Sequence, residues 1–288
     1  MKYWCFLFFF VAVCNYVCVA SFYGLNFGID QNNCPALQHY IDEFNQIKTY
    51  TNRVRSYAMA VCNEGELALK ASQSTGMNIY LGMWVGRSDT FESEFNGLQQ
   101  LVNSGVSFKN VDAIIVGSEV LYRNDATPQT LANYIGRVAN LVHPLGVKVT
   151  TSELYSQIYL SPVVDTVDFL MMNAFPYWEG VQIDQAVAKL FEHYDAVANR
   201  VNGKDIKISE TGWPSLGANF QASVPSPDNQ RTYVKGVLCE AQKRGVDVLY
   251  FSAMDESYKS GVEGSFGIMD ANYHLKAPIT MQDLSQSC

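Results

Sequence analysis

Eight short apolar segments recur along this chain and alternate with longer segments that have the periodicity of amphipathic helices. Most of the apolar segments lack polar alternation, which is typical of strands buried on both faces of a parallel sheet. Strands joined by helices predict such a sheet, and eight is the number of strands that closes a (β/α)8 barrel. The expected strands are residues 22–27, 54–58, 78–83, 113–117, 147–152, 169–173, 206–209 and 248–253. The expected helices are residues 36–48, 64–74, 90–103, 128–143, 183–199 and 229–244, the last beginning after Asp228.

An open, doubly wound sheet is the rival fold. It is disfavoured because no Gly-x-Gly-x-x-Gly follows the first expected strand, and an open sheet of eight strands is less usual for one uninterrupted domain. No low-complexity tract, linker or charge block divides the 288 residues. Because α/β barrels reach this size as one domain, we predict a single barrel over residues 21–288.

Residues 1–20 have the organisation of a secretory signal peptide, with Lys2 near the start, an apolar stretch over 6–13 and small residues before Ser21. A transmembrane anchor is the alternative, but Asn15 interrupts the apolar run well short of about 20 residues. Removal of this segment leaves four of the seven cysteines, and an even number in a secreted chain suggests two disulfides with three possible pairings. We predict Cys34 with Cys62 and Cys239 with Cys288, because these pairs close the shorter loops.

The formal net charge of the chain is −8, and loss of Lys2 makes it more negative. This acidity argues against nucleic acid and anionic membrane surfaces as partners. Cys-x-x-Cys, His-Glu-x-x-His and Gly-x-Ser-x-Gly are all absent. The four histidines, which lack metal-ligand spacing, are His39, His143, His193 and His274. We therefore expect no metal and no cofactor.

The carboxyl ends of barrel strands form one rim, and in this chain they carry carboxylates and aromatic rings. Rings cover the apolar faces of a sugar and acids serve its glycosidic bond, so this combination predicts a carbohydrate cleft. The strand-end residues are Asn26, Asp30, Tyr57, Trp84, Glu119, Glu153, Asn173, Phe175, Tyr177, Trp178, Glu210, Trp213, Asp255 and Glu256.

Two glutamates follow buried strands in matching contexts. Glu119 lies in VGSEVLYR (residues 116–123) and Glu210 in KISETGWPS (residues 207–215). Glycoside cleavage needs two carboxyl groups at one bond, one protonated and one ionised. Glu153, Asp255 and Glu256 are rival acids that the pattern does not exclude, and Lys259 is spaced to pair with Glu256.

With these residues the sequence resembles glycoside hydrolase family seventeen, and within it the fungal cell-wall branch of β-1,3-glucanases and β-1,3-glucanosyltransferases. The resemblance covers essentially all of residues 22–288. It rests on FYGLNFG (22–28), VRSY (54–57), VGSEVLYR (116–123), NAFPYW (173–178), ETGWP (210–214), Glu256 with Lys259, and SFG (265–267). The ETGWP motif at the end of a strand is the most specific of these.

The resemblance implies a catalytic (β/α)8 barrel with Glu119 as general acid/base and Glu210 as nucleophile. Ser118 stands where the plant branch has an Asn that contacts the sugar 2-hydroxyl, and a serine fits the fungal branch. Residues 173–205 are too few for the subdomain that plant members carry around the sixth helix, so this subdomain is expected to be reduced and the acceptor side open. The candidate substrate-binding residues are Tyr57, Ser118, Tyr122, Asn173, Phe175, Tyr177, Trp178, Glu179, Trp213, Glu256 and Lys259.

A retaining reaction through a covalent glycosyl-enzyme is the expected mechanism, with the two carboxyl groups about 5–5.5 Å apart. We predict substantial transfer to a second sugar, with Tyr122, Trp178 and Glu179 as the acceptor platform. A hydrolytic endo-β-1,3-glucanase, a non-catalytic β-glucan-binding wall protein and a glycosidase of another barrel family remain alternatives. The expected partners are β-1,3-glucan and laminarioligosaccharides, acted on by a monomer that is secreted to the medium or the cell wall.

Overall fold

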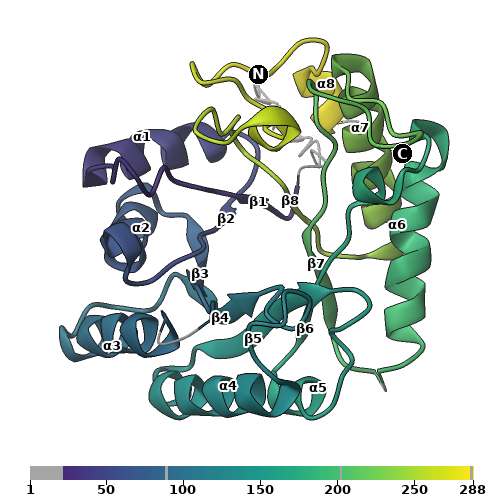
Figure 1. Ribbon diagram of the computed structural model, residues 1–288. Helices are drawn as coiled ribbons and strands as arrows, with labels where there is room; N and C mark the ends of the chain where they lie inside the picture. The colour runs from purple at the N-terminus through teal and green to yellow at the C-terminus, as the bar shows by residue number, and fades with distance from the viewer. Residues whose placement is uncertain (1–21, 88–89, 202, 286–287) are drawn as a thin grey trace, which may run out of the picture.

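A computed structural model describes residues 22–87, 90–201, 203–285 and 288, and the predicted signal peptide over residues 1–20 lies outside this part of the chain. Its parallel strands surround one axis and its helices cover the outside of the ring (Figure 1). This is the (β/α)8 barrel that the alternation of segments predicted. The strands are β1 Gly24–Asn26, β2 Arg53–Arg55, β3 Asn78–Met83, β4 Val111–Ser118, β5 Lys148–Leu154, β6 Leu170–Asn173, β7 Ile206–Glu210 and β8 Leu249–Tyr250.

The ring of strands follows the order of the chain, and β8 pairs with β1. β7 and β8 close the ring through a parallel bridge between Ile208 and Val248. The Phe251 N–H donates to the Thr211 carbonyl at 2.8 Å beyond the end of these strands. Closure excludes the open doubly wound sheet and brings all the carboxyl ends of the strands to one rim.

Six long helices match the predicted ones in position. They are α1 Leu37–Ile47, α2 Glu64–Thr75, α3 Thr90–Asn103, α4 Pro128–Val142, α6 Ile183–Ala198 and α7 Pro227–Arg244. The predicted start of α7 is wrong, because Ser226, not Asp228, caps the helix: its hydroxyl accepts from the Asn229 N–H at 3.1 Å, and Pro227 occupies the first turn.

Short helices complete the connections between strands. They are α5 Val163–Thr166, α8 Met281–Ser285 and the 3-10 turns η1 Val61–Asn63, η2 His143–Leu145, η3 Pro176–Glu179 and η4 Gly261–Ser265. Elements of three to five residues are too short for the periodic spacing of apolar residues that identifies a helix in a sequence. Between β6 and β7 the described residues form only η3 and α6, which agrees with the predicted reduction of this segment.

The barrel strands are buried on both faces. Ala113 and Ile115 of β4 pack in a small cluster with Tyr80, Phe169 and others, whereas Ile114 and Val116 pack in the large core shared with the helices. Alternate residues of one strand therefore enter different apolar clusters, because successive side chains point to opposite faces. This double burial explains why the strand segments are continuously apolar.

Both predicted disulfides are present, joining Cys34 to Cys62 and Cys239 to Cys288. The first connects the β1–α1 loop to η1 at the rim of the barrel, and the second ties the end of the chain to α7. Within the described part of the chain, no helix has both the length and the apolar character needed to cross a membrane.

Candidate active site

The β4 strand delivers Glu119 to the rim through a tight turn. Gly117 has φ 79°, and a Cβ added there would lie 2.3 Å from Val120 Cγ2. Glu119 itself has φ 57°, a region that non-glycine residues seldom occupy. The turn is held because the Glu119 N–H donates to the Ser152 carbonyl at 2.8 Å and its carbonyl accepts from the Arg123 N–H at 3.0 Å. Unusual backbone held in this way is typical of functional sites.

Glu210 ends β7 and forms a buried ion pair with Arg55 of β2. Arg55 Nη1 lies 2.6 Å from Glu210 Oε1 and also donates to the Ser209 carbonyl at 3.1 Å. The Arg55 side chain is 1% exposed and that of Glu210 is 10% exposed. The guanidinium therefore supplies a cation in direct contact with the Glu210 carboxylate.

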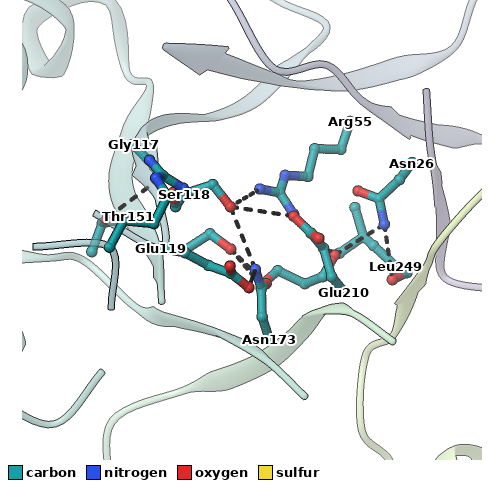
Figure 2. A network of polar contacts seen from close by, with 12 residues as sticks. Asn26, Arg55, Gly117, Ser118, Glu119, Thr151, Asn173, Glu210 and Leu249 are labelled. Carbon is teal, nitrogen blue, oxygen red and sulfur yellow. Dashed lines mark hydrogen bonds and ion pairs between the residues drawn. The ribbon is translucent and has the colours of Figure 1, made fainter. Parts of the chain in front are cut away.

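Ser118 and Asn173 link the two glutamates, as Figure 2 shows. Asn173 Nδ2 donates to Glu119 Oε1 at 3.0 Å and lies 3.4 Å from Ser118 Oγ. Ser118 Oγ in turn donates to Glu210 Oε1 at 3.3 Å and accepts from Arg55 Nη2 at 3.1 Å. One polar network therefore connects both carboxyl groups at the rim of the barrel.

The two carboxyl groups differ in their electrostatic environment. Burial raises the pKa of Glu119 above its usual value of 4.5, and the negative charge of Glu210 raises it further. The hydrogen bond from Asn173 opposes this shift without cancelling it. Because Arg55 binds Glu210 directly, the pair consists of one carboxyl group that favours its proton and one that is matched by a cation.

A cleft of about 580 Å3 contains both glutamates. Four of the predicted binding residues line it, namely Tyr57, Ser118, Glu256 and Lys259. The loop of residues 28–32 after β1, Trp84, Arg123, Tyr258 and Glu263 line it as well. The Arg123 guanidinium lies 4.5 Å from the centre of the Trp84 ring, so these two side chains form a joint surface on the β3–β4 side.

Tyr57 lies against the ion pair. Its ring centre is 4.7 Å from the Arg55 guanidinium, and its hydroxyl is buried beside Glu210 without a hydrogen bond of normal geometry. Burial and the neighbouring Glu210 charge raise the pKa of this phenol well above its usual value. Its backbone N–H donates to Glu64 Oε1 at 2.9 Å, which anchors the β2 end of the cleft to α2.

Glu256 is oriented by two side chains from its own loop. Lys259 Nζ donates to its Oε2 at 2.7 Å and the Tyr258 hydroxyl donates to its Oε1 at 2.6 Å. The loop packs against Gly28, where an added Cβ would lie 1.9 Å from Glu256 Oε1. The predicted pair of Glu256 and Lys259 is therefore present and borders the cleft.

Two of the predicted sugar-contacting residues are instead part of the core. Trp213 and Tyr177 are both 0% exposed, and their ring centres are 5.4 Å apart at a near-perpendicular angle. Trp213 Nε1 donates to the Val224 carbonyl at 3.0 Å and the Tyr177 hydroxyl donates to the Ala218 carbonyl at 2.6 Å. The prediction of sugar contact is wrong for both, because the loop after β7 covers them and they brace that loop.

The other predicted binding residues are not among those that line the cleft. Trp178 and Tyr122 are 40% and 55% exposed, while Phe175 is half-buried and packs edge-on against Phe251. Glu179 is half-buried and both its oxygens lie 2.9 Å from His193 Nε2. Asn173 is fully buried, so its amide acts on Glu119 and Ser118 and has no open face for sugar.

The rival acids have other partners. Glu153 is fully buried, and its Oε1 accepts from the Leu121 N–H at 3.0 Å, so it supports the turn that carries Glu119. Burial raises the pKa of Glu153 to about 7. Asp255 is paired with Lys276 at 2.7 Å and is absent from the residues that line the cleft. Across the described residues, no group of three or more His, Cys, Asp or Glu side chains could hold a metal ion.

Sequence reasoning missed the role of Arg55 and the contributions of Gly28 and Tyr258 to the cleft. Arg55 was visible as a charged residue within the buried segment 54–58, and a buried charge requires a partner. The contributions of Gly28 and Tyr258 depend on loop packing, for which the sequence carries no comparable signal.

Comparison with known proteins places the chain among carbohydrate-active barrels. The BtgE/BtgC glycoside hydrolase domain matches residues 24–267. A glucan 1,3-beta-glucosidase of Saccharomyces cerevisiae is 30% identical over 279 residues, covering 88% of this chain and 89% of the relative. A glucan 1,3-beta-glucosidase of Schizosaccharomyces pombe is 34% identical over 261 residues, covering 84% and 81%.

Two solved structures are similar over nearly the whole chain. An active-site mutant of the Rhizomucor miehei β-1,3-glucanosyltransferase, in complex with laminaritriose, has a TM-score of 0.89 and 50% identity, covering 93% of this chain and 98% of that one. The structure of a glycoside hydrolase family 17 β-1,3-glucanosyltransferase from the same organism has a TM-score of 0.87 and 52% identity, covering 90% and 97%.

Proposed function

This chain belongs to the family of the BtgE/BtgC glycoside hydrolase domain, and from that premise we propose that it is a retaining β-1,3-glucanosyltransferase with some hydrolytic activity. The predicted resemblance to the fungal branch of family seventeen is confirmed, and the chain is an enzyme active on β-1,3-glucan. The roles of individual residues and the choice of acceptor belong to the proposal.

The observation that carries the mechanism is the electrostatic asymmetry of Glu119 and Glu210 within one cleft. Glu119 has a raised pKa, which suits a general acid, and Glu210 is bound by Arg55, which suits a nucleophile that must be ionised. Arg55 and Ser118 both contact Glu210 Oε1, so attack by Oε2 preserves both contacts.

In the first step Glu210 forms a bond to the anomeric carbon while the glycosidic bond breaks and Glu119 gives its proton to the leaving oxygen. The donor glucan is then held as a glycosyl ester of Glu210. In the second step Glu119, now ionised, takes the proton of an incoming hydroxyl, which attacks the anomeric carbon and releases Glu210. The expected product has the same anomeric configuration as the substrate.

Water, at about 55 M, competes with a sugar hydroxyl for the glycosyl-enzyme. The sugar is the acceptor if a binding platform gives its hydroxyl a high enough effective concentration at the anomeric carbon. Tyr122 and Trp178 present exposed rings, and His193 restrains Glu179, the residue that follows Trp178. These features support the proposed platform. Replacing Trp178 with Ala should lower the ratio of transfer to hydrolysis without lowering total donor cleavage to the same extent, and an unchanged ratio would remove Trp178 from the platform.

Location outside the cell, in the medium or the wall, is part of the proposal. The two disulfides and the fungal glucan-active relatives support it, because such crosslinks persist in oxidising compartments. A monomeric state and the lack of nucleic-acid and membrane partners stay predictions from the sequence.

The test is product analysis with a defined laminarioligosaccharide and the purified protein. Products longer than the substrate support the transferase, and only shorter products would make the enzyme an endoglucanase. Glu210→Gln is the matched control, since it keeps the shape of the side chain and removes the nucleophile. Turnover equal to wild type in this variant would refute the assignment, and no turnover by the wild-type protein would favour the glucan-binding protein.

A further inference from the structure

A second cavity of about 730 Å3 lies beside the catalytic cleft, between the loop after β1, the start of α1 and the loop after β8. We refer to it as the side cavity and define it by Asn33, His39, Glu43, Ser257 and Tyr273, which line it and do not line the cleft. Its volume falls within the range of about 300–1,000 Å3 that is usual for small-molecule sites. None of the steps described above uses this cavity.

The side cavity and the cleft share a wall. Gly28, Ile29, Asp30, Glu256 and Tyr258 line both spaces. Within this wall Tyr258 packs closely against Gly28, where an added Cβ would lie 2.8 Å from the Tyr258 hydroxyl. Tyr258 is 40% exposed. A chain that lies in the cleft against Glu256 is therefore adjacent to the second cavity.

One buried acid that lines the side cavity has an oxygen without a hydrogen bond. Glu43 is 7% exposed, and its Oε2 has no hydrogen-bond partner in the structure described here. His39 Nε2 lies 3.6 Å from this oxygen, beyond hydrogen-bond distance. Burial raises the pKa of Glu43 to about 8 and lowers the pKa of His39, so near neutral pH both side chains are uncharged.

Three other acids line the side cavity, and of these Asp30 accepts, among the described residues, only the Asn32 N–H, at 3.0 Å, while the other two are paired with lysines. Glu256 is paired with Lys259 and Asp255 with Lys276, both at 2.7 Å. Among the residues that the structure describes, the side cavity has no cluster of unpaired carboxylates to bind a cation. Its several acids would repel an anion. A neutral ligand with many hydroxyls suits a protonated Glu43, which offers one donor and one acceptor, and the aromatic ring of Tyr273.

We propose that the side cavity binds a glucosyl unit of the same β-glucan whose scissile bond lies in the cleft. This inference rests on the proposed function, since it assigns the cavity to the substrate of that reaction. Two sources can supply such a unit: the continuation of the β-1,3-linked main chain, or a β-1,6-linked side unit on a residue held at the shared wall. The binding chemistry is the same for both.

The experiment compares kcat/KM for laminaritetraose, laminariheptaose and a laminaritetraose that carries one β-1,6-linked glucosyl unit. The blocking variant is Ala36→Trp, since Ala36 is exposed and lines only the side cavity. Ala198→Trp is the matched control, an exposed alanine at the end of α6 that lines neither space. Tyr273→Ala is a second test that removes a ring without filling the cavity.

We expect the wild-type enzyme to have a higher kcat/KM for one of the two larger substrates than for laminaritetraose. In Ala36→Trp this ratio of kcat/KM values should fall by about tenfold, which corresponds to the loss of an aromatic contact and a hydrogen bond. A preference for the heptaose indicates main-chain continuation, and a preference for the branched sugar indicates a side unit. Activity on laminaritetraose should stay within about twofold. The proposal is overturned if the wild type has no preference, or if Ala36→Trp and Tyr273→Ala keep it.

Binding of the same three sugars, measured by calorimetry, separates this inference from the proposed function. If the wild-type protein does not turn over any of the sugars, the proposed function fails. Weaker binding of a larger sugar by Ala36→Trp, with no change in Ala198→Trp, would still identify the side cavity as a glucosyl site. Identical affinities for all three proteins would count against it independently of catalysis.

Discussion

Replacing Asn173 with Ala removes the hydrogen bond that Asn173 Nδ2 donates to Glu119 Oε1 at 3.0 Å. The hydroxyls of Ser152 and Ser209 each donate to Asn173 Oδ1 at 2.7 Å, so the amide is held with its N–H groups toward Glu119. A hydrogen bond to a carboxylate favours the ionised form. The pKa of Glu119, already raised by burial, should therefore rise further in the variant.

The size of this rise follows from the strength of the lost interaction. A hydrogen bond to a charged group contributes about 1.5–3 kcal/mol, and one pKa unit corresponds to about 1.4 kcal/mol. Glu119 is only partly buried, so water replaces part of the interaction and we expect a rise of about one unit. Because the general acid must be protonated, the alkaline limb of kcat/KM should move upward by about one pH unit.

The assay is the pH dependence of kcat/KM for a laminarioligosaccharide. Asn26→Ala is the matched control, since Asn26 is equally buried and donates to the Ser209 and Leu249 carbonyls at 3.0 and 3.2 Å without contacting Glu119. This control should lose stability and keep the position of the limb. If the limb is unmoved in Asn173→Ala, or moves equally in both variants, Asn173 does not set the protonation of Glu119.

Glu119→Gln should lower kcat/KM on laminarioligosaccharides by about 10²–10⁴-fold while the fold is retained, as steady-state kinetics and circular dichroism can check. Arg55→Met should reduce the free energy of unfolding by about 3–5 kcal/mol because it leaves Glu210 buried without its cation. Arg137→Met, at an exposed ion pair, should cost less than about 1 kcal/mol in the same denaturant titration, and equal losses would refute this explanation. Glu64 is 1% exposed and burial raises its pKa to about 8, so the folded state holds a proton that the unfolded state loses above about pH 4.5. Stability should accordingly decrease as pH rises from about 4.5 to about 8, and Glu64→Gln should reduce the slope by up to about 1.4 kcal/mol per pH unit over this range.

The candidate site was only partly predictable from the sequence. Glu119 and Glu210 follow continuously apolar segments, and the carboxyl ends of parallel strands meet at one rim, so their presence in one cleft could be inferred. Trp213 follows the same strand as Glu210 but is fully buried. Position after a strand identifies residues near the rim, whereas exposure depends on which loop folds over them.

Local sequence patterns were sufficient to predict the architecture and the types of side chain available at the rim. Double burial of eight strands and the periodicity of six helices are local properties of the chain, and they specify a closed parallel barrel. Loop length was enough to select the two disulfide pairings that the structure contains.

The difference between the two acids and the location of the side cavity depend on tertiary contacts. Arg55 reaches Glu210 from a strand that lies far away in the sequence, and Asn173 reaches Glu119 from a third strand. The loops after β1 and β8 belong to opposite ends of the chain, and the side cavity forms where they pack together. Such contacts join segments that are far apart in the sequence, and local sequence patterns do not encode their distances. Burial and the pKa shifts that it causes arise only when the folded barrel brings these segments together.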